Sequence, residues 1–289
     1  MIGQQKLVAQ IADLIEKDKF PRFSIVVGER GMGHEDVGRV VAERLECPYI
    51  LLQDVKVDTI RKMIADAYKL HETMVYIIPH ADDMSINAKN ALLKVVEDTP
   101  NKAYFIMCLE DLSNTLATIQ SRGIVFRMCQ PTVDEIKEFA RELYVNKGDI
   151  DEEEIKYIGD ICMSEGDVVY MTHHGAKNFY RYAKYVADNI FNVSGAEVFK
   201  FSDKLALKDE EDKYDCRLFL KALQLQFWEM CTCAFKGAHD SSKCNYLCSC
   251  NIARCIGRYM QDLRIKGINK TMLMDNLWLE VRKLWKSQT

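Results

Sequence analysis

Five short apolar runs, alternating with segments of helical periodicity, constrain the fold of this chain more than any other feature. The runs fall in the first half of the sequence, at residues 23–27, 49–52, 74–78, 104–108 and 124–126. Between them, apolar residues recur three and four positions apart, as Leu7, Ile11 and Leu14 do. Strands that alternate with helices predict a parallel, doubly wound α/β sheet with helices on both faces.

After about residue 130 the pattern changes to helices. Thr132 and Glu135 have the spacing of a capping box, which predicts a helix start. The acidic run 151–154 suits the first turn of a further helix because the helix dipole favours negative charge there. No strand is predicted beyond this point, and residues 203–215, with six acids and three bases, are predicted to be a solvated linker.

Charge and hydropathy exclude several classes of protein. The 289 residues are 48% hydrophobic, which is enough for a core in each of about two or three domains. A formal net charge of −4 argues against a surface that is basic throughout and wraps nucleic acid. No apolar run approaches the ~18 residues needed to cross a bilayer, and the first residues do not have the pattern of a secretory leader. These features predict a cytoplasmic protein without a membrane partner.

The 11 cysteines raise the question of a metal site. Several lie near His239 in the last third of the chain, among them Cys244 and Cys248. The sequence contains no Cys-x-x-Cys pair, whereas zinc sites commonly use two such pairs. The pattern favours buried thiols in a helical core, and we predict no metal.

A glycine loop between a predicted strand and a predicted helix resembles a phosphate-binding loop in its spacing. Gly28, Gly31 and Gly33 supply the glycines, but His34 stands where the lysine should be and Glu35 where the hydroxyl should be. The lysine contacts the β- and γ-phosphates and the hydroxyl holds Mg²⁺. A short, mostly neutral histidine and an added carboxylate therefore predict a degenerate nucleotide site.

The acidic motif that orients Mg²⁺ and water in nucleotide hydrolases fails in the same way. At the end of the third predicted strand, Pro79 and His80 occupy the acidic positions. Asp82 and Asp83 follow, and they are predicted to cap a helix beside Ser85. Two independent losses argue against ATP hydrolysis by this chain.

The most specific segments lie in the middle of the chain. Residues 90–97 read Asn-Ala-Leu-Leu-Lys-Val-Val-Glu, and residues 115–123 read Thr-Leu-Ala-Thr-Ile-Gln-Ser-Arg-Gly. Both strings resemble motifs of the AAA+ clamp-loader subunits. Weaker likenesses to the same family occur at residues 2–4, 164–167 and 269–277.

The resemblance implies a chain in three parts. These would be an AAA+ (P-loop NTPase-like) domain over residues 1–130, a small helical lid over 131–177 and an all-α collar over 178–289 that joins a five-subunit ring. A chain that keeps the Ser-Arg motif but lacks a working ATP site resembles the delta-prime class of subunits in the bacterial DNA polymerase III clamp loader. The resemblance then implies a non-catalytic subunit without a cofactor of its own. Its partners would be the ATPase subunits and delta, with the sliding clamp and primed DNA bound through the complex.

Within this family Arg122 would be an arginine finger that reaches ATP on a neighbouring subunit. A planar guanidinium suits that task because it stabilises charge on a transferring phosphoryl group. Thr118 and Ser121 would support its loop. The spacing alone favours an ordinary surface arginine at position 122, and Thr118 and Ser121 could make only local turn hydrogen bonds.

The chain also departs from the family pattern. Ala117 and Gly123 replace a proline and a cysteine of the Ser-Arg motif, and Val169 replaces a lid arginine. Cys47 is the one cysteine in the segment where many delta-prime subunits carry a zinc module, so no zinc is expected there. Three alternatives remain open at this stage: an active or nucleotide-binding ATPase with unusual ligands, the clamp-binding delta subunit, and a paralogue that works outside replication.

Overall fold

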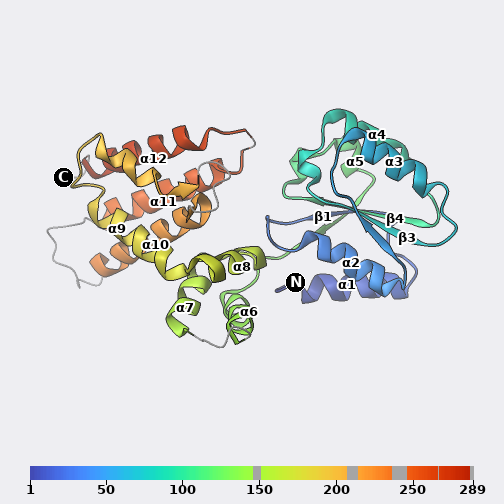
Figure 1. Cartoon of the computed structure of the whole chain (residues 1–289), viewed down its shortest axis with the longest axis horizontal. Helices are drawn as coiled ribbons and strands as arrows, with labels where there is room; N and C mark the ends of the chain where they lie inside the picture. Colours follow the sequence, from blue (N-terminus) through green and yellow to red (C-terminus); the bar gives the residue numbers. More distant parts are fainter. Residues whose placement is uncertain (146–150, 207–213, 236–245, 266, 287–289) are drawn as a thin grey trace. The chain divides into compact units, whose positions relative to one another are not determined.

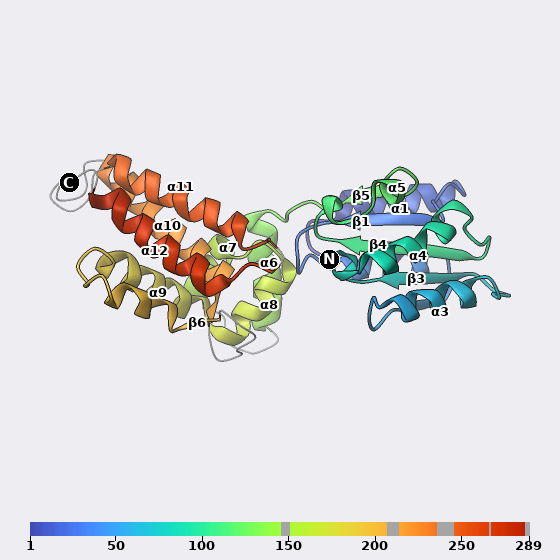
Figure 2. The same cartoon turned by 90° about the horizontal axis from the view of Figure 1, so that it is seen from above.

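The computed structural model describes residues 1–145, 151–206, 214–235, 246–265 and 267–286. The chain divides into two compact units (Figures 1 and 2). Unit 1 comprises Met1–Phe139 and Met163–Val168, and unit 2 comprises Ala140–Cys162 and Val169–Thr289.

Unit 1 contains the predicted parallel α/β sheet. Its strands are β1 (Phe23–Val27), β2 (Tyr49–Leu51), β3 (Met74–Ile78), β4 (Ala103–Leu109) and β5 (Ile124–Arg127). Its helices are α1 (Gln5–Glu16), α2 (His34–Arg44), α3 (Val57–Ala67), η1 (Ala81–Asp83), α4 (Ile86–Glu97), η2 (Leu112–Asn114) and α5 (Ala117–Gln120). The five strands form one sheet in the order β2-β3-β4-β1-β5, and every neighbouring pair is parallel. The predicted fold class and all five predicted strands are therefore confirmed.

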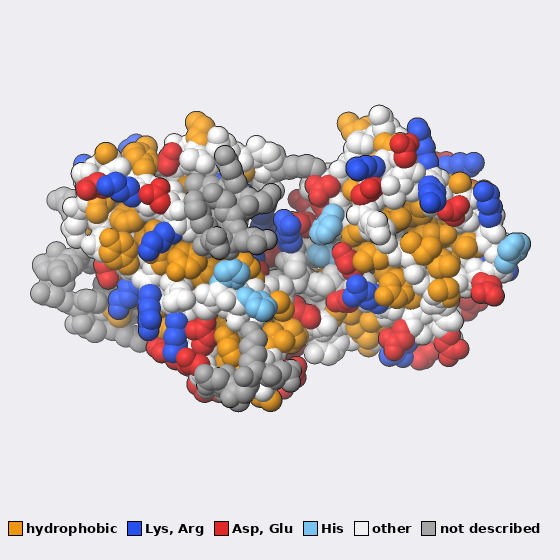
Figure 3. Space-filling view, in the orientation of Figure 1, with side chains coloured by type: hydrophobic (Ala, Val, Ile, Leu, Met, Phe, Trp, Pro, Cys, Tyr) orange, Lys and Arg blue, Asp and Glu red, His pale blue; other side chains and the backbone are white. Residues whose placement is uncertain are grey.

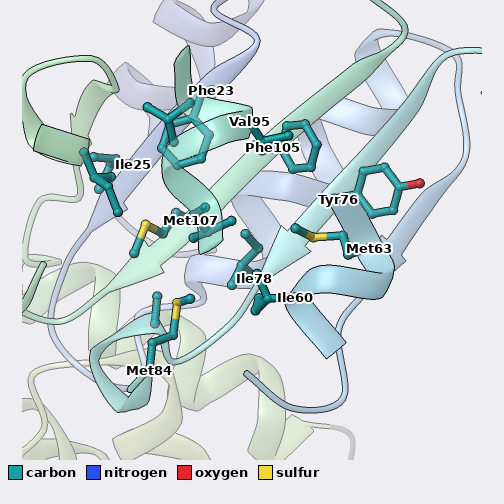
Figure 4. Close-up of a cluster of buried hydrophobic side chains, with 14 of the residues drawn as sticks. Phe23, Ile25, Ile60, Met63, Tyr76, Ile78, Met84, Val95, Phe105 and Met107 are labelled. Atoms are coloured by element: carbon teal, nitrogen blue, oxygen red, sulfur yellow. The ribbon is translucent and has the colours of Figure 1, made fainter. Parts of the chain in front are cut away.

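Each face of the sheet has its own hydrophobic core. On one face, Phe105 and Tyr76 stack with ring centroids 5.3 Å apart and pack under α3 and α4 (Figure 4). On the other face, Val26 and Ile106 pack under α1 and α2. Burial on both faces explains why β1, β3 and β4 are almost wholly apolar in the sequence, with Ser24 of β1 as the exception.

The two predicted helix starts are confirmed. Ahead of α6 (Val133–Val145), the Thr132 amide donates to the Glu135 carboxylate at 2.8 Å, and the Glu135 amide donates to the Thr132 hydroxyl at 3.3 Å. The Thr132 amide and the Thr132 hydroxyl, which lies 2.9 Å away, both donate to the Glu135 carboxylate; they stabilise its charged form and lower the pKa of Glu135. Asp151 likewise caps α7 (Glu152–Ile161) by accepting hydrogen bonds from the backbone amides of Glu153 and Glu154.

Unit 2 is built on helices packed around aromatic side chains. Beyond α7 the described helices are α8 (Glu165–His174), which begins in unit 1, α9 (Ala176–Asn189), η3 (Glu197–Ser202), α10 (Cys216–Phe235), α11 (Tyr246–Asp262) and α12 (Lys270–Lys286). Trp278 of α12, Phe219 of α10 and Phe179 of α9 are all fully buried. This burial supports helix packing as the role of the aromatic residues in this region.

The prediction of no strand after residue 130 is wrong. Within the region predicted to be a solvated linker, β6 (Leu205–Ala206) and β7 (Tyr214–Asp215) form a short parallel pair, and Leu205 is fully buried. Residues 207–213, which carry most of the charge of that region, lie outside the described residues. The charged run separates the two dipeptides in the sequence, and neither is long enough to give a strand signal of its own.

Charges of both signs alternate on the surface. In Figure 3 basic and acidic side chains are intermixed on the visible faces of both units, without a continuous basic area. None of the helices within the described residues has the length and apolarity that a membrane crossing requires.

Candidate functional site

The glycine loop joins β1 to α2 at the carboxyl edge of the sheet, where α/β proteins bind ligands. Gly31 and Gly33 have φ of +83° and +81°, a left-handed conformation that favours glycine. Just beyond the loop, His34 points back into it, with Nε2 2.7 Å from the Gly28 carbonyl oxygen. Since a carbonyl oxygen can only accept a hydrogen bond, the ring proton lies on Nε2, which donates a hydrogen bond to the loop. The predicted residues are thus brought together, and the side chain at the lysine position is bonded to its own loop.

Two acidic side chains, Glu35 and Asp82, lie near the carboxyl edge of the sheet. Glu35 lies in the first turn of α2, where the helix dipole favours a carboxylate. Burial, together with the negative charges of Glu35 and Asp82, raises the pKa of the Cys108 thiol in β4 far above its usual range. These charges oppose the binding of a polyphosphate at this edge.

The acidic motif positions carry no carboxylate in the structure. Pro79 and His80 follow β3, and His80 has a left-handed backbone with φ +45°. Ser85 caps α4 by accepting a hydrogen bond from the backbone amide of Ala88.

The predicted capping role of Asp82 is wrong. Its carboxylate instead accepts hydrogen bonds from the backbone amides of Glu110 and Asp111 and from the Asn114 side chain, at 2.7, 3.2 and 3.0 Å. It therefore fixes the loop that follows β4, a long-range role that capping rules do not predict.

The segment Met163–Val168, which also belongs to unit 1, packs against the glycine loop. The Gly166 amide donates to the Gly31 carbonyl at 2.9 Å, and the Ile2 amide donates to the Glu165 carboxylate at 3.3 Å. A Cβ on Gly31 would lie 2.7 Å from the Ser164 hydroxyl, and one on Gly166 would lie 3.0 Å from the Gly31 Cα. This close backbone approach requires glycine on both sides.

We expect Gly31→Ala to release this segment from the loop. A left-handed backbone costs a residue with a Cβ about 1–2 kcal/mol, and the new methyl group would also collide with Ser164. Hydrogen exchange at the Gly166 amide should become faster in the variant. Gly195→Ala is the matched control, because a Cβ at Gly195 meets nothing within 4 Å. Unchanged exchange at Gly166 would contradict the expected clash.

The Ser-Arg motif forms the end of α5 and the turn into β5. One Arg122 Nη atom donates to the Thr118 carbonyl oxygen at 3.1 Å, and the other lies 3.1 Å from a carboxylate oxygen of Glu97. The Ser121 hydroxyl also donates to the Thr118 carbonyl at 3.1 Å. The Arg122 side chain is 42% exposed. In the structure Thr118 holds Arg122 through its backbone carbonyl.

Arg122 and the glycine loop lie at opposite edges of the sheet. The register of the parallel β1–β5 pair places Ser24 beside Ile124, which follows Arg122 by two residues. From Ser24 to Gly28 the strand advances roughly 13 Å at about 3.3 Å per residue. Arg122 is thus presented at the amino edge, away from the loop of its own chain.

Glu97, the last residue of the 90–97 motif, also belongs to this site, and its pairing with Arg122 is not predicted by the sequence. It is the last residue of α4 and is separated from Arg122 by 25 positions in the sequence. The available signal is a carboxylate in the last helical turn, where the dipole disfavours negative charge.

The cysteine-rich region shows no assembled metal site within the described residues. There, no three His, Cys, Asp or Glu side chains lie close enough together to hold a metal ion. Cys231, Cys248 and Cys255 are buried. Cys244 and His239 lie outside the described residues.

The chain is similar in sequence to subunits of DNA polymerase III. The family model described as "DNA polymerase III, delta subunit" matches residues 52–132. DNA polymerase III subunit gamma of Buchnera aphidicola subsp. Schizaphis graminum is 24% identical over 224 residues, which is 67% of this chain and 60% of that protein. DNA polymerase III subunit delta' of Yersinia pestis is 28% identical over 115 residues, which is 39% of this chain and 34% of that protein.

The structural comparison concerns the fold alone. A point mutant of Thermotoga maritima RuvB aligns with 83% of this chain and 84% of its own, with 16% identity and a TM-score of 0.51. The parallel sheet, the glycine loop and the helices that follow define an AAA+ fold. Within that class, the sequence matches are to subunits of DNA polymerase III, at low identity and over about 60% or less of each relative's own length.

Proposed function

We propose that this chain is a non-catalytic clamp-loader subunit of the delta-prime type, which does not use ATP itself and supplies Arg122 to ATP bound by a neighbouring subunit. Residues 131–177 would serve as the lid and residues 178–289 as the collar that joins the ring. The partners would be the ATPase subunits and delta, with the sliding clamp and primed DNA bound through the assembled complex.

The observation that carries this proposal is the state of the glycine loop. His34 stands in place of the phosphate-binding lysine, and its Nε2–H donates a hydrogen bond to the Gly28 carbonyl of the same loop. The carboxylate of Glu35 follows it, and Pro79 and His80 replace the acids that would hold Mg²⁺. Charge, metal ligation and loop geometry thus all oppose nucleotide hydrolysis here.

Arg122 supports the second half of the proposal. It lies at the amino edge of the sheet, and its guanidinium is held at the surface by the Glu97 carboxylate and the Thr118 carbonyl. An arginine in this position cannot act on the loop of its own chain but can face an adjacent subunit. Finger arginines supplied in this way stabilise charge on a transferring phosphoryl group.

Titration of the isolated chain with MgATP tests the inactive site. We expect no binding tighter than a Kd of about 1 mM, or about −4 kcal/mol. An ATPase subunit of the same loader, measured in parallel, is the positive control. Micromolar binding would overturn the degenerate-site argument and favour the ATPase alternative. Direct, tight binding of the sliding clamp by the isolated chain would favour the delta alternative.

A further inference from the structure

The ion pair between Glu97 and Arg122 joins the motif at residues 90–97 to the motif at residues 115–123. Glu97 ends α4, and Arg122 follows α5. One Nη atom of Arg122 lies 3.1 Å from Glu97 Oε1, and the side chains are 42% and 55% exposed, respectively. The other Nη atom donates to the Thr118 carbonyl at 3.1 Å. Two acceptors from different elements therefore fix the plane of one guanidinium.

The position of Glu97 is unfavourable for its own helix. A carboxylate in the last turn of a helix faces the negative end of the helix dipole. The Glu97 side chain is exposed, and the hydrophobic packing of α4 depends on other residues such as Leu92 and Val95, which are fully buried. The stability of the helix thus does not account for a carboxylate here, whereas the contact with Arg122 does.

The two bonds leave the guanidinium able to bind an anion. A guanidinium has five N–H donors in a rigid plane. The contacts with Glu97 and Thr118 use one donor on each Nη atom, so that three donors remain. Because exposed ion pairs are weak, Glu97 can orient the side chain without outcompeting a phosphate.

We propose that Glu97 is a positioning residue, which holds Arg122 at the amino edge of the sheet for a nucleotide phosphate on the adjacent subunit. This inference rests on the proposed function of Arg122. Without Glu97 the arginine keeps only the Thr118 carbonyl, and its long side chain samples more rotamers. The adjacent site then encounters a correctly oriented guanidinium less often, so the rate of chemistry falls while ATP affinity stays the same.

Steady-state ATP hydrolysis by the loader, reassembled with its cognate ATPase subunits, tests this inference. Glu97→Ala should lower kcat about two- to fivefold, within the worth of an exposed ion pair, and leave KM for ATP unchanged. The kcat of Glu97→Gln should lie between those of the wild type and Glu97→Ala, because the glutamine amide oxygen can still accept a hydrogen bond from Arg122. Asp98→Ala is the matched control: it removes the neighbouring carboxylate at the same helix end and should leave kcat unchanged.

The double variant Glu97→Ala/Arg122→Ala separates positioning from a general structural effect. If Glu97 acts through Arg122, the double variant is no slower than Arg122→Ala alone. Two results would overturn the positioning role and leave the finger role standing. In the first, Glu97→Ala lowers kcat by the same factor whether residue 122 is arginine or alanine. In the second, Arg122→Ala lowers kcat but Glu97→Ala leaves it unchanged or raises it. If Arg122→Ala itself has no effect in an assembled complex, the proposed function fails and this inference fails with it.

Discussion

Replacing Arg122 with alanine is expected to lower the ATP turnover of the reassembled complex by about 10³-fold at the neighbouring site that we propose Arg122 completes, the lower end of the range for finger arginines. The physical reason is the loss of a fixed positive charge where negative charge develops on the transferring phosphoryl group. Because Arg122 is exposed and outside the hydrophobic cores, the variant should fold and assemble normally. The measurement is single-turnover ATP hydrolysis by complexes whose assembly has been verified by size-exclusion chromatography.

Two further variants sharpen this prediction. Arg122→Lys keeps the charge but loses the planar fork, so it should restore only a small part of the rate. Arg61→Ala is the matched control, because Arg61 is an exposed arginine of α3 in a long, 3.9 Å pair with Asp58. An intact Arg122→Ala complex with an unchanged rate would reduce this chain to a scaffold.

Replacing Trp278 with alanine is expected to cost unit 2 about 3–5 kcal/mol of its free energy of unfolding, the range for large aromatic residues deleted from a core. Trp278 is fully buried, and its ring contacts Phe201 and Phe219 with ring centroids 6.0 and 6.4 Å away. Its indole N–H donates to the Ser202 hydroxyl at 2.8 Å, so the variant also leaves a buried hydroxyl unpaired.

Native-state hydrogen exchange on the full chain measures this loss by region. Amides of α10 and α12 should lose protection in Trp278→Ala, while amides of β1, β3 and β4 serve as an internal reference because the sheet has its own cores. Trp228→Ala is the matched control, since Trp228 on α10 is 38% exposed. A loss no larger than that of Trp228→Ala would show that the core of unit 2 does not depend on Trp278.

Much of the candidate site follows from local sequence. The strand before the glycine loop and the helix after it fix where Gly28 and His34 lie relative to the sheet, and both elements carry strong local signals. The capping box at Thr132 and Glu135 is equally local, since both partners lie within one helical turn. Short-range hydrogen-bonding rules and hydrophobic periodicity are sufficient for features of this kind.

Contacts between distant segments escaped prediction because no local rule determines them. Asp82 resembles a cap in sequence, but its carboxylate accepts hydrogen bonds from the loop after β4, 28 to 32 positions away. The pairing of β6 with β7 brings together dipeptides on either side of a charged run. The contact of Gly166 with Gly31 depends on two glycines 135 positions apart.

The sequence by itself determined the α/β class, the five strands, the absence of a lysine after the glycine loop and of acids at positions 79 and 80, and the string that contains Arg122. These depend on residue types and short spacings, which are present in the unfolded chain. Only the tertiary structure decided the strand order, the bond from His34 to its own loop, and the position of Arg122 beside Glu97 at the edge opposite that loop. The physical reason is that side chains from different elements acquire their distances only when burial of apolar faces packs those elements together.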